Sequence, residues 1–311
     1  MTIDILMTGP MMAIVEDGLG AAGHTIHRLW QAPDREAFLA EIAPKIRGIA
    51  TSYAHARVDP ALIDRLPALE IISNFGVGYE NIDAAYAKSR GIVVTNTPDV
   101  LTDETADTAM GLLLMTVREL SRAERYLRAG RWPQAPYPLT PASLTDRRLG
   151  IYGLGRVGKA IARRAEAFNM PIAYCGRTRQ DVPWRYHASL VEMARDVDVL
   201  VAAAPGGAAT RHAVDAEVLK ALGPTGILVN VGRGSLVDTE ALIEALESRA
   251  ILAAGLDVYE DEPRVPERLI ACDNAVLLPH VGSASIPTRE AMARLTRDNL
   301  LGWFREGRAL T

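Results

Sequence analysis

The chain has 311 residues, of which 49% are hydrophobic and 23% are charged, and its formal net charge is −4. These values are ordinary for a globular protein and allow two domains, each with its own core. They exclude a disordered or fibrous chain and give no basic surface for nucleic acid or an anionic membrane. The N-terminus lacks the pattern of a signal peptide and no apolar stretch reaches about 18 residues, so we expect a cytoplasmic protein.

The cysteine content argues against a disulfide scaffold and against a metal centre. The chain has two cysteines, Cys175 and Cys272, which lie far apart in the sequence and lack the spacing of metal ligands. We therefore expect neither disulfide bonds nor a bound metal.

The first hundred residues alternate short runs of β-forming residues with helical runs. Helices are expected over residues 34–46 and 59–66, and Asp59 followed by Pro60 is typical of a helix N-terminus. Strands that alternate with helices predict a parallel sheet. The expected strands are Ile3–Met7, Thr25–Leu29, Gly48–Thr51, Glu70–Ser73 and Ile92–Thr95.

A long helix is expected after Pro98, from Leu101 to Arg128, with Gly130 as its C-cap. Its apolar residues cover more than one face, which indicates a buried helix. A sheet would bury one side and a second subunit another, so we expect a homodimer formed through the region 101–130. The loop at residues 131–146, rich in proline and aromatic residues, is too long to be a simple connection.

A glycine-rich turn lies between an apolar run and a helical run in the middle of the chain. Gly153, Gly155 and Gly158 have the spacing G-x-G-x-x-G, which allows a tight turn, close approach to a pyrophosphate, and packing of the helix on the strand. The anion would bind the N–H groups at the positive end of the helix dipole. A plain turn is the alternative, but the strand before it and the helix after it favour dinucleotide binding.

Strands and helices continue to alternate around this turn, which predicts a doubly wound domain. Strands are expected at 149 and over 171–174, 198–202, 226–230, 251–254 and 275–278, and helices over 215–222 and 238–248. The segment 285–305 is an amphipathic helix by its pattern.

The residues after the second strand of this domain predict the cofactor. NAD-binding domains of this type place an acidic residue there to bind the ribose 2′-hydroxyl, but Gly176 stands at that position. Arg177, Thr178 and Arg179 follow it and could bind a 2′-phosphate through charge-assisted hydrogen bonds. NADP(H) is therefore favoured over NAD(H), although two arginines on a surface loop are the simpler alternative.

Three further side chains follow strands of the same domain. Arg233 lies between glycines after one apolar strand, Glu262 lies in an acidic segment after the next, and His280 directly follows a third. Each alone could be a turn arginine, a solvated acid or a core histidine. Because parallel strands end at one edge of a sheet, we expect the three to converge there, as a carboxylate-binding fork and a histidine charged by a glutamate.

These residues make the chain recognisable: it resembles the D-isomer-specific 2-hydroxyacid dehydrogenases, most closely the glyoxylate/hydroxypyruvate reductase and hydroxyphenylpyruvate reductase branch. The resemblance covers about residues 70–285 and rests on several motifs in order. They are Ser73-Asn74-Phe75-Gly76-Val77-Gly78, the turn Gly153–Gly158, Asn230–Gly234, Gly255-Leu256-Asp257-Val258 with Glu262-Pro263, and Pro279-His280-Val281-Gly282-Ser283.

The resemblance implies a role for each matching position. Arg233 would bind the carboxylate and carbonyl of a 2-oxoacid, His280 would donate a proton to the carbonyl oxygen, and Glu262 would orient and charge His280. The backbone N–H groups of Val77 and Gly78 would bind the substrate carboxylate. The implied cofactor contacts come from Gly153, Leu154, Gly155, Arg156, Val157 and Gly158 around the pyrophosphate, and from Asp257, Thr102 and Val231 near the nicotinamide.

The resemblance also implies two Rossmann-like α/β domains with the active site in the cleft between them. The substrate-binding domain would be discontinuous, formed by residues 1–98 plus 284–311, and residues 99–283 would form the dinucleotide-binding domain. The implied activity is NADPH-dependent reduction of a small 2-oxoacid to the D-2-hydroxyacid.

Two enzyme relatives are less consistent with these residues, because formate dehydrogenases pair their histidine with glutamine and phosphoglycerate dehydrogenases generally prefer NAD. A dinucleotide-sensing corepressor also shares the fold, and Arg233, Glu262 and His280 do not exclude that role. The acidic net charge and the absence of long disordered tails argue against it. The substrate stays open between glyoxylate, hydroxypyruvate, 2-ketogluconate and arylpyruvates. Its selection is expected at residues 52–55, at Phe75 and at residues 132–139, whose aromatics could line a pocket or reach a partner subunit.

Overall fold

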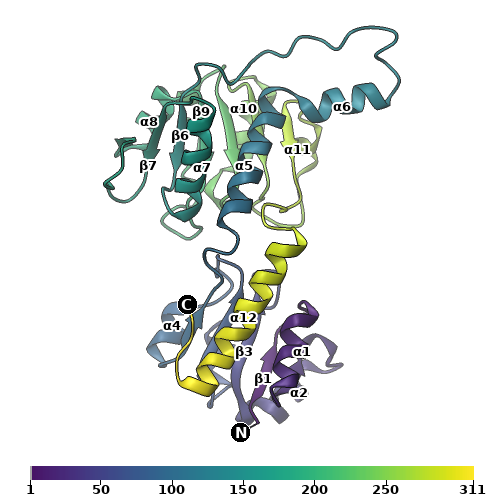
Figure 1. Ribbon diagram of the computed structural model, residues 1–311, viewed down its shortest axis with the longest axis vertical. Coiled ribbons are helices and arrows are strands. Elements are labelled where there is room, and N and C mark those ends of the chain that lie inside the picture. The colour runs from purple at the N-terminus through teal and green to yellow at the C-terminus, as the bar shows by residue number, and fades with distance from the viewer. Residues whose placement is uncertain (1) are drawn as a thin grey trace. The chain divides into compact units, whose positions relative to one another are not determined.

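The computed structural model describes residues 2–311, which form two compact α/β units. One unit comprises the chain up to Leu101 together with Ser285–Thr311, and the other is Thr102–Ala284. The first unit therefore contains both ends of the chain, as the N and C labels of Figure 1 indicate. Each unit is built on a parallel sheet, which confirms the predicted fold class.

The first unit has a five-stranded sheet in the order β2-β1-β3-β4-β5, all parallel. Successive residues of β1 point to opposite faces: Ile5 packs in one core and Leu6 in the other. The strands are β1 (Asp4–Met7), β2 (Thr25–Arg28), β3 (Ile46–Ser52), β4 (Ile71–Phe75) and β5 (Val93–Thr95). The helices are α1 (Ala13–Ala21), α2 (Arg35–Ile42), α3 (Pro60–Asp64), α4 (Ala84–Ser89) and α12 (Ile286–Glu306).

The C-terminal helix α12 is part of the core of the first unit. Its first turn is capped by Ser285, whose Oγ accepts from the N–H of Thr288 at 3.4 Å. Leu300 is fully buried against the same face of the sheet that α1 covers. Asp59 likewise caps α3, at 3.0 Å from the N–H of Leu62, as its sequence predicts.

The second unit has a seven-stranded parallel sheet in the order β12-β11-β10-β9-β6-β7-β8. The strands are β6 (Leu149–Tyr152), β7 (Ile172–Cys175), β8 (Arg185–His187), β9 (Val199–Ala202), β10 (Ile227–Asn230), β11 (Ala253–Leu256) and β12 (Ala275–Leu277). Helices α5 (Thr102–Val117) and α7 (Arg156–Ala167) cover one face. The other face carries α8 (Leu190–Asp196), α9 (Ala216–Leu222) and α10 (Thr239–Glu247), and α11 (Glu267–Ala271) packs near β12. The strand order reverses between β6 and β9, which is where doubly wound sheets bind ligands.

The predicted single helix from Leu101 to Arg128 is wrong in one respect, because it is broken into α5 and α6 (Leu120–Arg128). Glu119 adopts a left-handed backbone with φ 49°, which no α-helix can continue through. Gly130 has φ 66° and ends α6 as predicted. Figure 1 shows α6 and the following long loop extending away from the body of this unit.

Truncation of Leu300 tests the assignment of α12 to the first core. Leu300→Ala is expected to lower the free energy of unfolding by ~2–5 kcal/mol, because it leaves a cavity beneath the sheet. The matched control is Ile286→Ala in the same helix, whose residue is 73% exposed and whose truncation should change stability by less than ~0.5 kcal/mol. Urea unfolding followed by tryptophan fluorescence measures both, and equal losses would contradict the packing.

Candidate active site

A histidine and a glutamate form a close pair beyond two neighbouring strands of the second unit. His280 follows β12, and its Nδ1 lies 2.7 Å from Oε2 of Glu262, in the segment after β11. The other carboxylate oxygen of Glu262 accepts the N–H of Tyr259 at 2.9 Å. The glutamate side chain is 14% exposed and the histidine side chain 32% exposed. The pair thus turns one ring nitrogen toward a fixed carboxylate and leaves Nε2 as the nitrogen that can act on a substrate.

Asp257 fixes the segment that carries the histidine. Its carboxylate accepts the N–H groups of Val281 at 2.7 Å and Gly282 at 2.8 Å, and its carbonyl accepts the N–H of His280 at 2.9 Å. Burial raises the pKa of Asp257, while these two N–H donors to its carboxylate act in the opposite direction. A Cβ at Gly282 would lie 2.7 Å from this carboxylate, so the contact requires glycine.

Tyr259 ties the same two strand ends together. Its hydroxyl donates to the carbonyl of Leu278 at 2.9 Å. Burial raises the pKa of Tyr259 to about 12, so the phenol stays protonated and keeps donating at cellular pH. The residue is therefore a structural link between the end of β12 and the acidic segment after β11.

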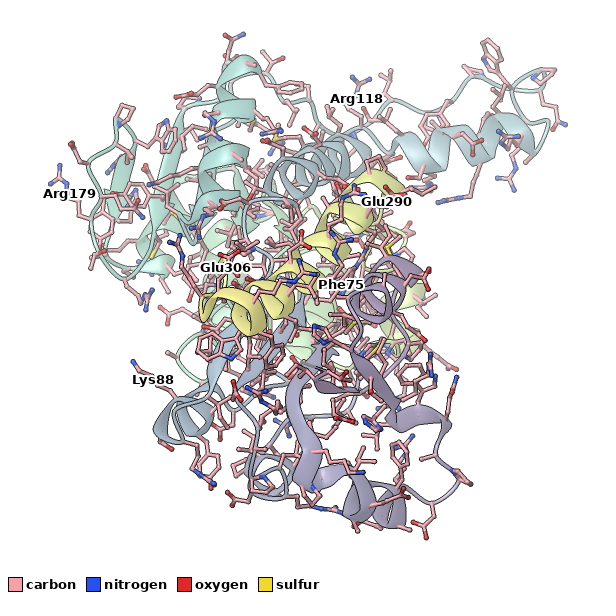
Figure 2. All side chains as sticks on the ribbon, turned by 60° about the horizontal axis from the view of Figure 1, so that its bottom comes forward. Phe75, Lys88, Arg118, Arg179, Glu290 and Glu306 are labelled. Atoms are coloured by element: carbon pink, nitrogen blue, oxygen red, sulfur yellow. The ribbon has the colours of Figure 1, made fainter. Side chains whose placement is uncertain are left out.

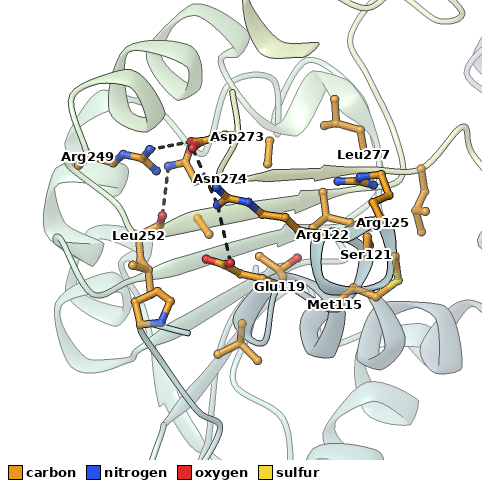
Figure 3. Close-up of a pocket in the computed structure, with 17 residues that line it drawn as sticks. Met115, Glu119, Ser121, Arg122, Arg125, Arg249, Leu252, Asp273, Asn274 and Leu277 are labelled. Atoms are coloured by element: carbon orange, nitrogen blue, oxygen red, sulfur yellow. Dashed lines mark hydrogen bonds and ion pairs between the residues drawn. The ribbon is translucent and has the colours of Figure 1, made fainter. Parts of the chain in front are cut away.

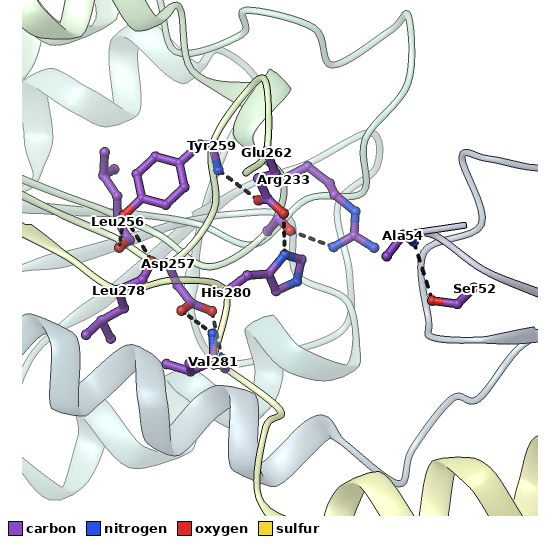
Figure 4. Close-up of polar contacts among 12 residues, drawn as sticks. Ser52, Ala54, Arg233, Leu256, Asp257, Tyr259, Glu262, Leu278, His280 and Val281 are labelled. Carbon is purple, nitrogen blue, oxygen red and sulfur yellow. Dashed lines mark hydrogen bonds and ion pairs between the residues drawn. The ribbon is translucent and has the colours of Figure 1, made fainter. Parts of the chain in front are cut away.

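Arg233 is brought beside this pair by a backbone contact. It follows β10 in a turn closed by Asn230, whose side chain donates to the Arg233 carbonyl at 2.9 Å. A Cβ on the next residue, Gly234, would lie 1.8 Å from the carbonyl carbon of Tyr259. The turn after β10 therefore packs directly on the turn after β11, and Figure 4 shows Arg233, Glu262 and His280 gathered beyond the strand ends. The three residues converge as their positions in the sequence predict.

The glycine turn after β6 has the shape that a pyrophosphate requires. A Cβ at Gly153, where φ is 99°, would lie 2.5 Å from the backbone of Ala204, and one at Gly158 would lie 2.2 Å from the carbonyl oxygen of Gly153. By contrast, no atom lies within 4 Å of a Cβ built on Gly155. Gly155 is also the N-cap of α7 and provides no side-chain cap, so open space faces the first turn of this helix. The turn therefore fits a dinucleotide.

The segment after β7 presents two arginines to solvent. Arg177, Thr178 and Arg179 are all exposed, and within residues 2–311 neither arginine forms an ion pair. Figure 2 shows Arg179 pointing outward from the ribbon. Both guanidinium groups are thus available to an anion.

Gln180, which the sequence analysis did not single out, connects this segment to the glycine turn. Its side-chain amide donates to the carbonyl of Leu154 at 2.8 Å, and its backbone N–H donates to the hydroxyl of Tyr174 at 2.7 Å. No local motif marks a glutamine as such a link, because its contact with Leu154 joins segments that are 26 residues apart in the sequence.

The remaining candidates lie at strand or helix ends. Thr102 is the first residue of α5, and Val231 is buried directly after β10. In the first unit, the turn after β4 is fixed by Asn74, whose amide donates to the carbonyls of Gly76 and Gly78. Within residues 2–311 the N–H groups of Val77 and Gly78 make no hydrogen bond, so they can bind an external acceptor.

A separate pocket of about 570 Å³ lies between the α5–α6 break and the edge strand β12. Figure 3 shows that it is lined by charged side chains, among them Arg122, Arg249 and Asp273. Arg249 pairs with Asp273 at 2.6 Å, and no candidate catalytic or cofactor residue contributes to the lining. The pocket is therefore not part of the site described above.

Two kinds of feature are absent from residues 2–311. They contain no group of three histidine, cysteine or acidic side chains placed to bind a metal ion. They also contain no helix that is both long enough and apolar enough to cross a lipid bilayer.

Comparisons with known proteins match this architecture along nearly the whole chain. The model of the family "D-isomer specific 2-hydroxyacid dehydrogenase, NAD binding domain" matches residues 110–282. Glyoxylate/hydroxypyruvate reductase A from Arabidopsis thaliana is 45% identical over 304 residues, which cover 97% of this chain and 96% of the relative. Hydroxyphenylpyruvate reductase from Plectranthus scutellarioides is 44% identical, with coverages of 97% and 96%.

A solved structure agrees equally well. The NADPH-dependent glyoxylate/hydroxypyruvate reductase of Sinorhizobium meliloti, crystallised with NADP and malonate, is 50% identical to this chain and superposes with a TM-score of 0.94. The match covers 100% of this chain and 96% of that one. The chain therefore belongs to the D-isomer specific 2-hydroxyacid dehydrogenases, a family of oxidoreductases.

Proposed function

We propose that this protein reduces a small 2-oxoacid, of the glyoxylate or hydroxypyruvate type, to the D-2-hydroxyacid with NADPH. The observation that carries the proposal is the pairing of His280 with Glu262 at 2.7 Å, beside Arg233 and in the same unit as the glycine turn. The activities of the Arabidopsis and Sinorhizobium relatives support the same substrate class.

Different residues of the second unit bind different parts of the cofactor. The glycine turn Gly153–Gly158, which leads into the first turn of α7, binds the pyrophosphate, and Asp257 with Thr102 and Val231 binds the nicotinamide end. Arg177, Thr178 and Arg179 bind the 2′-phosphate, which the exposure of both arginines supports. When bound, NADPH supplies the hydride for the carbonyl carbon of the substrate.

The chain's own residues supply the proton and the orientation. Arg233 offers two parallel N–H donors to the substrate carboxylate, and the N–H groups of Val77 and Gly78 add two more. His280 donates the proton from Nε2 to the carbonyl oxygen as negative charge develops there, because its Nδ1 is turned to Glu262. Glu262 keeps the ring in that orientation.

The same proposal assigns substrate binding to the unit that contains Val77 and dinucleotide binding to the unit 102–284. In the substrate-binding unit, residues 52–55 and Phe75 select the side chain of the oxoacid. Phe75 lies 5.8 Å from the guanidinium of Arg289, so an aromatic face and a cation are already paired there. Reduction of an arylpyruvate is the second candidate, favoured by the 44% identity to hydroxyphenylpyruvate reductase.

A homodimer formed through α6 and the loop after it is also part of the proposal. Leu127 and Trp132 are largely exposed and Leu139 is 99% exposed. Large apolar side chains gathered on an exposed segment are typical of a protein–protein interface. A cytoplasmic location is supported by the two cysteines, both of which are free thiols.

Replacement of His280 tests the catalytic assignment. His280→Ala is expected to lower kcat for glyoxylate or hydroxypyruvate by about 10²- to 10⁴-fold, since the proton donor is lost, while the Kd of NADPH stays nearly the same. The absorbance of reduced nicotinamide follows turnover. The control His27→Gln, in the first unit beside Asp4, should keep full turnover. Unchanged turnover in His280→Ala would remove the residue from the proton-donor role.

Replacement of Arg177 tests the cofactor assignment. Arg177→Ala is expected to raise the Kd of NADPH about ten- to hundredfold and to leave that of NADH nearly unchanged, because only NADPH presents a 2′-phosphate. Arg185→Ala is the matched control, since this exposed arginine on β8 already pairs with Asp196 at 2.7 Å. Equal losses for both cofactors would contradict the assignment.

A further inference from the structure

The acidic segment after β11 is bonded to a second histidine. Glu260, two residues before Glu262, accepts a hydrogen bond from Nε2 of His212 at 2.8 Å. His212 has φ 51° and His280 has φ 53°, so both histidines adopt the left-handed backbone that L-residues rarely use. Glu260 and Glu262 of one segment are thus each paired with a histidine whose backbone is left-handed.

Glu260 joins three parts of the second unit. Besides His212, its Oε1 accepts from Arg211 at 2.5 Å, and its Oε2 accepts from the hydroxyl of Thr239, the first residue of α10, at 3.3 Å. The glutamate side chain is 26% exposed although its backbone faces solvent. We call Arg211, His212, Thr239 and Glu260 the outer brace.

The backbone of His212 is itself attached to the turn that carries Arg233. Its N–H donates to the carbonyl of Ser235 at 2.8 Å, and the N–H of Val214 donates to that of Leu236 at 2.9 Å. The left-handed conformation at His212 therefore directs its ring from this turn toward Glu260. The segment after β9 is thus bonded to the turn after β10 through its backbone and to the segment after β11 through the Glu260 carboxylate.

We propose that the outer brace positions the acidic segment so that Glu262 faces His280. Glu260, Arg211 and His212 are positioning residues: they make no contact with the reacting atoms and act through Glu262. This inference rests on the proposed function, because it assumes that the Glu262–His280 pair delivers the proton.

The outer brace acts on the alignment of Glu262 more than on the stability of the fold. An ion pair that is partly exposed adds little to the free energy of unfolding. Tyr259, however, directly precedes Glu260 in the chain and donates its N–H to Glu262, so a shift at Glu260 moves the donor that orients Glu262. A misplacement of about 1 Å at a catalytic group can cost about 10²-fold in rate. Loss of the brace should therefore lower kcat far more than it lowers stability.

The test compares Glu260→Ala with a matched surface glutamate. Glu247, at the other end of α10 from Thr239, accepts two bonds from Arg268, at 2.8 and 3.2 Å, and among the described residues forms no hydrogen bond or ion pair with the outer brace. Glu260→Ala is expected to lower kcat about tenfold or more and to leave the Kd of NADPH within about twofold, whereas Glu247→Ala leaves both unchanged. Glu260→Gln, which keeps an acceptor for Arg211 and His212, should recover most of kcat. Unchanged kcat in Glu260→Ala, or failure of Glu260→Gln to recover it, would overturn the inference.

A double-mutant cycle separates this inference from the proposed function. If Glu260 acts through Glu262, its replacement should cost less than about twofold in a Glu262→Gln background. Equal losses in both backgrounds would overturn the inference alone, because they would show a general loosening of the site. Full turnover in Glu262→Gln would instead overturn the role of the Glu262–His280 pair in proton delivery and this inference with it, whereas only the absence of oxoacid reduction by the unmodified protein would overturn the proposed function. His212→Ala provides a second variant, expected to behave as Glu260→Ala does.

Discussion

The site depends on backbone contacts that only glycine permits. Where a Cβ at Gly234 would lie 1.8 Å from the Tyr259 carbonyl carbon, the turn after β10 meets the turn after β11. A similar contact between Gly153 and the backbone of Ala204 joins the turns after β6 and β9. Parallel strands end at one edge of the sheet, and these contacts reduce the space between their turns further. Side chains that are far apart in the sequence are thereby fixed on a rigid support.

Two carboxylates near His280 have different surroundings, and this separates their roles. Asp257 is 2% exposed and accepts two backbone N–H groups, so it orders the segment that carries the histidine. Glu262 accepts one backbone N–H and is otherwise turned to the imidazole ring. Under the proposed function, the first is a scaffold and cofactor ligand and the second keeps the proton donor oriented.

The sequence predicts the parts of this protein that are encoded by local pattern. Apolar strands followed by glycine, arginine, glutamate and histidine are enough to predict the doubly wound domain and the convergence of Arg233, Glu262 and His280. The break at Glu119 is not predictable in this way, because glutamate usually favours a helix and the left-handed backbone of this residue depends on tertiary contacts. The same holds for Gln180 and His212, whose contacts join distant segments. Hydrophobic periodicity also does not predict short elements such as α1, α4 and β8.

The most direct measurement of the central claim is the rate of NADPH and NADH consumption with a panel of oxoacids: glyoxylate, hydroxypyruvate, 2-ketogluconate and hydroxyphenylpyruvate. We expect consumption of NADPH in preference to NADH, with the highest kcat/KM for glyoxylate or hydroxypyruvate. A higher kcat/KM for hydroxyphenylpyruvate would establish the second candidate. Consumption of neither cofactor with any of these acids would contradict the proposed reductase.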